Sequence, residues 1–247
     1  GTTGEPATMT AEEIEELMRF SIKYTAGRAK VVFGSGANST AKAVAASVKA
    51  EQMGADGLLV VTPYYNKCTQ NGLYEYYKAV NDAVHIPIIC YNVPGRTGVN
   101  MLPATFAELA EHPNIAAVKE ASGNMEQIEE AIRLTEGKAV VYSGDDGITV
   151  PVMAMGGMGV ISVVSNAAPR FTAEMTSAFL SGDLKKAAKM QLDMLPLVRA
   201  LFSEVNPIPV KKAMQLRGLC NGTLRLPLTE MTAANAAKLA EILPAFV

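Results

Sequence analysis

The stretch IAAVKEASGN, residues 115–124, runs from apolar residues into a lysine, a glutamate and then a turn. A continuous apolar run of this length is typical of a strand in a parallel sheet that is covered on both faces. Lys119 would then be near the end of a packed strand, where lysine is unusual because it is rarely buried. The stretch predicts a parallel α/β fold in which strand ends carry polar side chains.

The strand predicted in this stretch is IAAVKE (115–120), and other apolar runs repeat its pattern: KVVFG (30–34), GLLVVT (57–62), IPIICYN (86–92), AVVYSG (139–144) and GVISVVS (159–165). Segments with helical spacing lie around them, at 10–25, 39–53, 70–83, 102–111, 124–135, 146–155 and 168–180. This alternation predicts parallel β/α units. The first helix has Thr10 followed three residues later by Glu13, which is the spacing of a capping box.

The segments that follow the strands are all polar or rich in glycine: GTTGE, GSGANST, TPYYN, YNVPGRTG, KEASGN, SGDD and SVVSNAA. An open doubly wound sheet would concentrate such segments near its switch point, whereas a β/α barrel builds its site from all strand ends. We therefore expect a (β/α)8 barrel domain over residues 1–181. Strand signals stop near Gly182, and helical segments at 183–202, 208–218 and 232–243 predict a helical domain over residues 182–247.

Composition excludes several classes of protein. The net charge of −2 offers no basic surface for nucleic acid, and no apolar run is long enough to span a membrane. The chain opens on GTTGEPATMT, in which we expect no signal peptide, and the expected location is the cytoplasm. The cysteines predict reduced thiols, and two histidines are too few for a histidine-based metal site. These residues are Cys68, Cys90, Cys220, His85 and His112.

Lys119 is the first candidate for chemistry. A lysine at a strand end often only extends its amine to solvent. Between AAV and EAS, however, it would sit at a concave mouth, where burial favours the neutral amine and lowers its pKa. Such an amine attacks carbonyl carbons and forms a Schiff base, so the pattern predicts aldolase-type chemistry.

The segment YNVPGRTGV, residues 91–99, can be interpreted as a simple turn around Pro94 and Gly95. It also places Tyr91 at a strand exit and Arg96 five residues later. A tyrosine can relay protons, and an arginine fork binds a carboxylate with two hydrogen bonds.

Two further loops carry hydroxyl groups. GTTGE offers Thr2, Thr3 and glycine-exposed backbone N–H groups that suit a small carboxylate, although an ordinary strand-to-helix loop would look the same. TPYYN carries Tyr64 and Tyr65, which alone would more often be packing or interface residues.

Two other motifs do not support a cofactor or a metal. GSGANS, residues 34–39, lacks the third glycine of a dinucleotide fingerprint. The adjacent Asp145 and Asp146 are predicted to cap the next helix, since aspartate is favoured there.

The set GTTGE, VVTPYYNK, YNVPGRTGV, VKEASGN, SGDD and GVISVVSN resembles the dihydrodipicolinate synthases, a branch of the pyruvate-dependent Schiff-base aldolases. The resemblance runs from the first residue to the last. The N-acetylneuraminate lyases of the same superfamily differ at YNVPGRTG, so Arg96 favours the synthase branch.

The resemblance implies condensation of pyruvate with L-aspartate 4-semialdehyde to 4-hydroxy-tetrahydrodipicolinate, in lysine and diaminopimelate biosynthesis. No cofactor or metal is implied beyond the covalent pyruvate imine on Lys119. Arg96 would bind the semialdehyde carboxylate, and Thr3 would bind the pyruvate carboxylate. The implied catalytic residues are Lys119, Tyr91, Thr2 and Tyr65, and the implied pyruvate pocket includes Gly144 and Ile161.

The resemblance also implies a homotetramer built as a dimer of dimers, in which Tyr65 crosses a subunit interface. Lysine inhibits many of these enzymes at that interface. The matching positions are Pro6, Ala7, Ala11, Ile14, Asn38, Lys42 and Tyr64. Lys42 stands where sensitive members have an acid that binds the effector's ammonium group, so we expect weak or absent inhibition.

Members of the resembled family begin with a strand, a helix and a second strand before GTTGE, about one βαβ unit. We therefore expect a barrel that lacks its first strand, first helix and most of its second strand. Either the molecule has residues before Gly1, or it is a cleaved or truncated product, or an incomplete barrel closes by association. Two alternative functions remain open: a lyase of 2-keto-3-deoxy or sialic acids, and a catalytically silent fragment.

Overall fold

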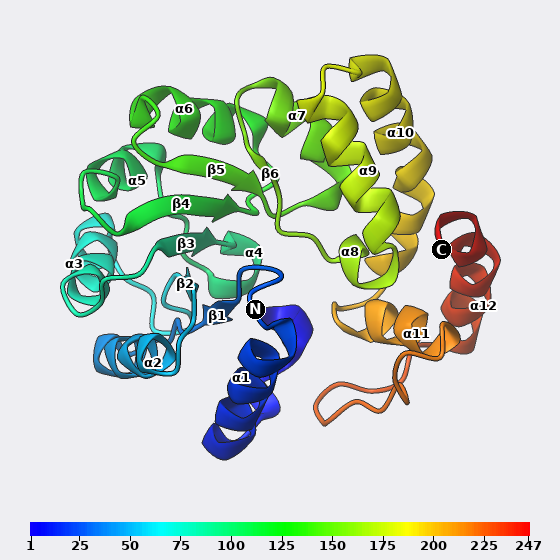
Figure 1. The fold of residues 1–247 in the computed structure, drawn as a ribbon, viewed down its shortest axis with the longest axis horizontal. Coiled ribbons are helices and arrows are strands. Elements are labelled where there is room, and N and C mark those ends of the chain that lie inside the picture. The colour runs from blue at the N-terminus through cyan, green and yellow to red at the C-terminus, as the bar shows by residue number, and fades with distance from the viewer. The chain divides into compact units, whose positions relative to one another are not determined.

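The computed structural model describes residues 1–247 (Figure 1). The chain divides into two compact units. The first comprises residue 1 with residues 10–144 and 155–158, and the second comprises residues 2–9, 145–154 and 159–247. Lys119 and the strand that carries it belong to the first unit.

The first unit contains a parallel sheet whose strands follow one another in chain order. They are β1 (Val32–Gly34), β2 (Gly57–Val61), β3 (Ile88–Asn92), β4 (Ile115–Glu120) and β5 (Val140–Ser143). Strands β2 and β4 are buried along almost their whole length, which explains their continuous apolar sequences. Parallel pairing brings the carboxyl ends of all these strands to one edge of the sheet.

Helix α1 (Ala11–Thr25) precedes β1, and the other helices of the first unit connect its strands along the chain (Figure 1). They are α2 (Thr40–Gln52), α3 (Gln70–Asn81), α4 (Pro94–Thr97), α5 (Pro103–Leu109) and α6 (Met125–Thr135). Large fully buried side chains from strands and helices fill the core: Leu58, Leu73, Tyr77, Ile88, Phe106, Leu109, Ile115 and Ile128.

The predicted capping box of α1 is confirmed. The Glu13 backbone N–H donates to Thr10 Oγ1 at 3.3 Å, and the Thr10 backbone N–H donates to Glu13 Oε2 at 2.9 Å. The two bonds satisfy N–H groups that have no partner inside the helix, which stabilises a helix start by about 1 kcal/mol.

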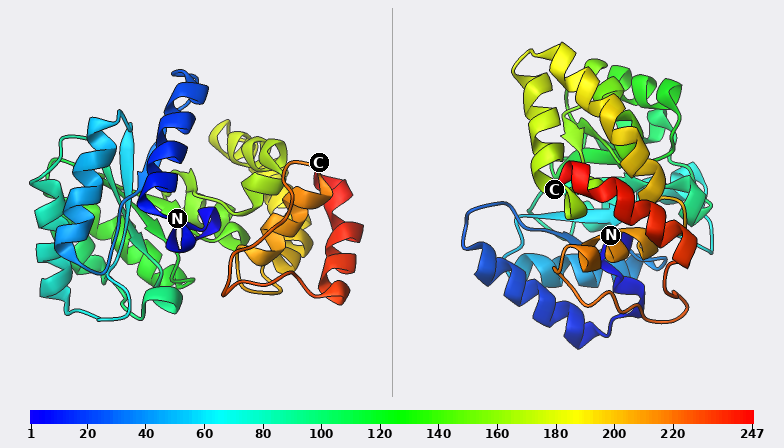
Figure 2. Two further views of the ribbon diagram at one scale, coloured as in Figure 1. Left: turned by 90° about the horizontal axis from the view of Figure 1, so that it is seen from below. Right: turned by 90° about the vertical axis from the view of Figure 1, so that its right-hand side faces the viewer.

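The second unit is mainly helical. It contains η1 (Thr2–Gly4), η2 (Pro6–Thr8), η3 (Asp146–Ile148), α7 (Thr149–Ala154), β6 (Gly159–Val160), α8 (Val164–Ala167), α9 (Pro169–Leu180), α10 (Leu184–Leu201), α11 (Ile208–Leu216), α12 (Ala233–Ile242) and η4 (Leu243–Phe246). Helix α10 packs against α9 and α12 (Figure 2). The hydrophobic core of the second unit includes Met175, Met194, Leu197, Leu201 and Leu239.

The α/β fold with a parallel sheet is confirmed, and the predicted strands and helices lie close to the observed ones. The predicted strand 159–165 is too long, since β6 ends at Val160 and α8 begins at Val164. The expectation of a barrel that lacks its first strands is not supported, because the observed strands pair in chain order as a regular α/β sheet. No helix combines the length and the apolar character that a membrane span requires.

Candidate active site

Lys119 is the second-last residue of β4 and is only 9% exposed. It pairs in register with Tyr91 on β3 and with Tyr142 on β5, so it lies in the middle of the sheet and not at its edge. The strand holds the lysine by backbone hydrogen bonds on both sides. A lysine placed in this way has lost much of its water, and so can serve as a nucleophile.

Tyr91 lies directly beside the lysine. Its ring centroid is 4.3 Å from Lys119 Nζ, and the tyrosine itself is 7% exposed. Side chains at paired positions of neighbouring parallel strands lie on the same face, which explains why the two groups meet. The ring of a residue type that can transfer protons thus lies beside the amine at one strand end.

Gly144 follows β5 and closes in on the same lysine. Its N–H donates to Glu120 O at 2.7 Å. A Cβ at this position would lie 3.2 Å from Lys119 Cε and 2.7 Å from Ala121 Cβ. The absence of a side chain at Gly144 therefore leaves room for the lysine stem.

Arg96 lies in α4, the short helix that begins just after β3, and it is exposed. The end of this helix is fixed by the buried Thr97, whose hydroxyl donates to Val99 O at 3.0 Å and accepts from Val99 N at 3.2 Å. Gly98 follows with a φ of 71°, the left-handed conformation that glycine adopts without strain. Arg96 therefore lies on a turn at a strand end that is stabilised by the hydrogen bonds of Thr97.

Tyr65 lies in the loop after β2, where its side chain is 90% exposed and its φ is 74°. A left-handed backbone is strained for a tyrosine and is sustained when the surrounding structure imposes it. Next to it, Asn66 Nδ2 donates to Asn38 O at 2.9 Å, which ties this loop to the one before α2. The structure therefore directs the Tyr65 ring into solvent.

Thr2, Thr3 and Ile161 belong to the second unit. Both threonines lie in η1 and are partly buried, and Asn206 Nδ2 donates to Thr3 Oγ1 at 3.1 Å. Ile161 follows β6 and is also partly buried. The structure thus brings Lys119, Tyr91 and Gly144 together in the first unit, and it places these three residues in the second.

The prediction that both aspartates of SGDD cap a helix is correct for one and wrong for the other. The Asp145 side chain accepts from Gly147 N at 2.8 Å and caps η3. Asp146 is instead fully buried. Its carboxylate accepts from the Ser162 hydroxyl, and from Val163 N and Val164 N at 2.9 and 3.2 Å.

These bonds hold the backbone N–H groups of Val163 and Val164 at the start of α8, so these two residues are not part of the strand that was predicted there. Burial raises the pKa of Asp146 above its ordinary value, and the three hydrogen bonds only partly oppose this shift.

Burial also determines the state of other polar groups near the strands. All three cysteines are free thiols, and burial raises the pKa of Cys90. Burial likewise raises the pKa of Tyr77, whose hydroxyl donates to Val60 O at 2.8 Å. Cys90 and Tyr77 therefore stay neutral at physiological pH and act as packing residues.

The sequence interpretation missed two buried polar residues, Asn92 and Glu120, which directly follow Tyr91 and Lys119 on their strands. Strand alternation was the signal that could have found them. If Lys119 faces one side of the sheet, its neighbour must face the other, where a glutamate requires hydrogen-bond partners.

A parallel α/β sheet with a buried lysine and a tyrosine paired at the strand ends places this chain in the class of α/β enzymes with strand-end sites. Comparison with known proteins gives the family. The model of the dihydrodipicolinate synthetase family matches residues 1–246, and the chain belongs to this family.

The relatives are similar over nearly the whole chain. A 4-hydroxy-tetrahydrodipicolinate synthase of Caldicellulosiruptor bescii is 54% identical over 95% of this chain and 79% of its own length. A monomeric dihydrodipicolinate synthase variant superposes with a TM-score of 0.98 and 42% identity, covering 100% of this chain and 84% of the variant. The dihydrodipicolinate synthase of Acinetobacter baumannii, solved in complex with pyruvate, superposes with a TM-score of 0.97 and 40% sequence identity. The match covers 100% of this chain and 86% of that enzyme.

Proposed function

We propose that this chain condenses pyruvate with L-aspartate 4-semialdehyde to 4-hydroxy-tetrahydrodipicolinate, a step of lysine biosynthesis, and that Lys119 is its Schiff-base residue. Membership of the dihydrodipicolinate synthetase family supports the reaction. The observation that carries the residue assignment is the buried Lys119 amine, 4.3 Å from the Tyr91 ring centroid at the strand ends.

In the proposed mechanism, Lys119 Nζ attacks the ketone carbon of pyruvate, and the carbonyl oxygen leaves as water to give an imine. Loss of a proton from the methyl carbon turns the imine into an enamine. That carbon then attacks the aldehyde carbon of the semialdehyde, whose oxygen takes up a proton. The amino group of the semialdehyde attacks the imine carbon, closes the ring and releases the Lys119 amine. The reaction uses no external cofactor.

These steps move several protons, and we assign the transfers to Tyr91, Thr2 and Tyr65. The position of Tyr91 beside the lysine supports its part. For Thr2 and Tyr65 the support is their hydroxyl chemistry in family motifs and, for Tyr65, a strained backbone that presents the ring outward.

We assign the binding of the two carboxylates to Thr3 and Arg96. Arg96 would bind the semialdehyde carboxylate, because its guanidinium is exposed on a turn that follows the Tyr91 strand. Thr3 would bind the pyruvate carboxylate, and Gly144 and Ile161 would line the pyruvate pocket. The close approach of Gly144 to the Lys119 stem supports its place there.

We further propose that the protein works in the cytoplasm as a homotetramer, in which Tyr65 reaches a neighbouring subunit. The exposed ring of Tyr65 supports a role at an interface. A division of the chain into a β/α domain over residues 1–181 and a helical domain over residues 182–247 also remains a proposal.

A condensation assay tests the function. The chain should consume pyruvate and L-aspartate 4-semialdehyde in equal amounts, and its product should be a substrate for a reductase that acts on dihydrodipicolinate. Cleavage of a sialic or 2-keto-3-deoxy acid, without the condensation, would contradict the proposal.

A further inference from the structure

A hydrogen-bonded cluster of polar side chains lies close to the lysine in sequence, but on the other face of the sheet. Asn92 and Glu120 pair in register, one position after the Tyr91–Lys119 pair. Since side chains alternate along a strand, they face away from the lysine. Both are almost fully buried, at 0% and 3% exposure. No step of the mechanism above uses them.

Glu120 receives only N–H donors. Its Oε1 accepts from Ser122 N at 2.7 Å, and its Oε2 accepts from Asn92 Nδ2 at 2.9 Å and from Gln127 Nε2 at 3.3 Å. Both side-chain oxygens of Glu120 therefore act as hydrogen-bond acceptors. Buried polar groups require such partners, so the cluster is built and not incidental.

The other end of the cluster holds the chain that follows Arg96. Asn92 Oδ1 accepts from Met101 N at 2.9 Å, and Asn92 Nδ2 also donates to Asn100 Oδ1 at 2.8 Å. Asn100 Nδ2 donates to Gln127 Oε1 at 2.7 Å. Residues 100 and 101 are thereby fixed to β3, β4 and α6. Since Arg96 lies between β3 and this anchor, both ends of its segment are fixed.

The orientation of the amides is determined by two backbone donors. Met101 N requires the oxygen of Asn92, which leaves Asn92 Nδ2 to face Glu120. Ser122 N requires an oxygen on the other side of Glu120. Residue 120 must therefore offer two acceptors, which a carboxylate does and an amide does not.

We propose that Asn92 and Glu120 are positioning residues that hold the Arg96 segment, residues 93–101, in place against the strand of Lys119. The inference rests on the proposed function, since it assigns the purpose of that placement to binding of the second substrate. The pair acts from the back of the sheet and touches no substrate.

The test uses Glu120→Gln and Asn92→Asp. In Glu120→Gln, the new NH2 group faces the NH2 group of Asn92, so two donors meet. In Asn92→Asp, the new carboxylate faces the carboxylate of Glu120, so two acceptors meet. We expect each to raise the KM for the semialdehyde about tenfold or more, because a misplacement of about 1 Å can cost far more than that. Trapping of pyruvate on Lys119 should still go to completion.

The exchanged pair Asn92→Asp/Glu120→Gln supplies the rescue. In this double variant the new aspartate at position 92 accepts from Met101 N. The new glutamine at position 120 donates to that aspartate through its NH2 group and accepts from Ser122 N through its oxygen. The side-chain amides of Asn100 and Gln127 rotate by half a turn, so that their donors and acceptors match the exchanged pair. We expect the KM to return to within about threefold of that of the unmodified chain. A residue that only stabilised the fold would not restore KM in this way.

Asn81→Asp is the matched control. Asn81 is also a buried amide, 5% exposed, and its Oδ1 accepts from Asn114 N at 3.1 Å at the opposite end of β4. It should lower stability and leave the KM for the semialdehyde unchanged. If Glu120→Gln does not fold, Gln127→Met removes one donor to Glu120 and should raise the KM about threefold.

Folded Glu120→Gln and Asn92→Asp proteins with an unchanged KM would overturn the proposal, as would an equal rise in Asn81→Asp. Hydrogen exchange separates this failure from failure of the function. If the unmodified chain traps no pyruvate, the proposed function is wrong. Faster exchange at Met101 N in Glu120→Gln would then still support the positioning role, and unchanged exchange would refute it.

Discussion

Lys119 and Tyr91 pair in register across β4 and β3, and the lysine Nζ lies 4.3 Å from the centroid of the tyrosine ring. The backbone ladder of the sheet sets this relationship, since paired positions on neighbouring strands face the same side. An amine and a phenol ring are therefore held together by the pairing of two neighbouring strands. Their placement does not depend on the conformation of a loop.

Replacing the lysine should abolish the chemistry. Lys119→Arg keeps the positive charge, but its guanidinium does not form an imine. We expect kcat to fall by on the order of 10⁴-fold or more, as is found for other covalent nucleophiles. The measurement is the condensation rate of purified, folded protein. A variant that kept a tenth of the rate would rule out Lys119 as the Schiff-base residue.

Removing the tyrosine hydroxyl should slow the proton transfers while leaving the lysine in place. Tyr91→Phe retains the ring that packs beside Lys119, so folding should be unaffected. We expect kcat to fall by about 10²- to 10⁴-fold, the usual contribution of a positioned acid or base. Pyruvate should still be trapped on Lys119, only more slowly. Normal turnover by Tyr91→Phe would exclude a role of this hydroxyl.

A methyl group at Gly144 should disturb the lysine. The added Cβ would lie 2.7 Å from Ala121 Cβ, which is closer than real Cβ contacts come, and 3.0 Å from Glu120 O, which is a tight contact. We expect Gly144→Ala to lower the free energy of unfolding by about 1–3 kcal/mol, as other overpacked sites do, and to reduce trapping of pyruvate.

Gly95→Ala is the comparison for stability, because a Cβ there meets nothing within 4 Å. Urea unfolding of both variants measures the difference. Equal stabilities would show that Gly144 is not closely packed.

The buried Asp146 should give a distinctive dependence of stability on pH. Because its pKa is raised in the folded state, the folded protein binds a proton more tightly than the unfolded chain. As pH falls through the raised folded-state pKa towards the ordinary value of 3.8, this group should stabilise the fold increasingly. The difference between the free energy of unfolding of the unmodified chain and that of Asp146→Asn should therefore increase as pH falls.

Asp56 provides the control of opposite sign. A hydrogen bond from Lys30 and one from Val31 N lower its pKa, so its stabilising contribution is lost as pH falls through that lowered value. Urea unfolding of the unmodified chain, Asp146→Asn and Asp56→Asn between pH 3 and pH 7 measures both trends. Each of the two carboxyl groups changes the number of protons bound on unfolding by at most about one. The same trend in both pairs would contradict the assignment for Asp146.

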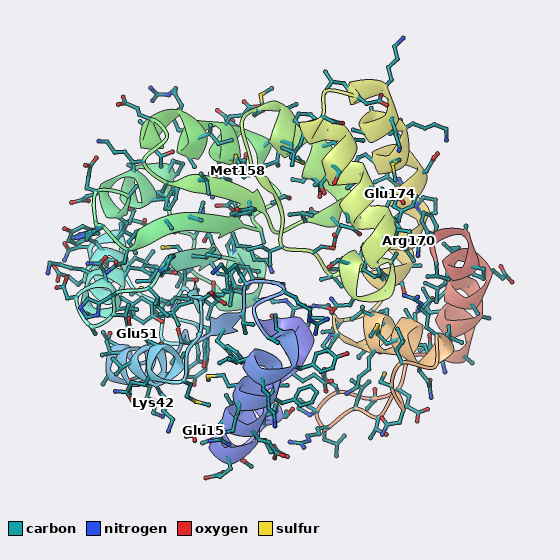
Figure 3. The ribbon with its side chains drawn as sticks, in the orientation of Figure 1. Glu15, Lys42, Glu51, Met158, Arg170 and Glu174 are labelled. Atoms are coloured by element: carbon teal, nitrogen blue, oxygen red, sulfur yellow. The ribbon has the colours of Figure 1, made fainter.

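Lysine should inhibit this chain weakly or not at all. Lys42 is exposed on α2, and Figure 3 shows its side chain on this helix. An ion pair between Lys49 and Glu15, at 3.1 Å, connects the same helix to α1. A positive side chain repels the ammonium group of a lysine effector. Lys42→Glu should make inhibition stronger, measured as the lysine concentration that halves the rate. Strong inhibition of the unmodified chain at micromolar lysine would refute the prediction.

Much of the fold could be predicted from the sequence because the strands are buried on both faces. β4 is continuous in its apolar residues, and its predicted bounds, 115–120, match the observed ones. The strand around 159–165 failed for a tertiary reason. The carboxylate of Asp146, distant in sequence, accepts from the N–H groups of Val163 and Val164, where α8 begins in place of the predicted strand.

The sequence was sufficient to predict a single residue with an unusual position, such as Lys119. It was not sufficient to predict a hydrogen-bond network whose members come from different segments. Lys119 stands out because lysine is unusual in a packed strand. Asn92 and Glu120 do not, because an amide and an acid at strand ends resemble ordinary turn residues. Their partners Asn100 and Gln127 come from separate segments, so only the folded structure reveals the cluster.

Borohydride reduction in the presence of pyruvate, followed by intact mass and peptide mapping, tests the central claim most directly. The account predicts one reduced pyruvate adduct per chain, located on Lys119, and none in Lys119→Arg. An adduct on a different lysine, or a folded chain that gains no mass, would contradict it.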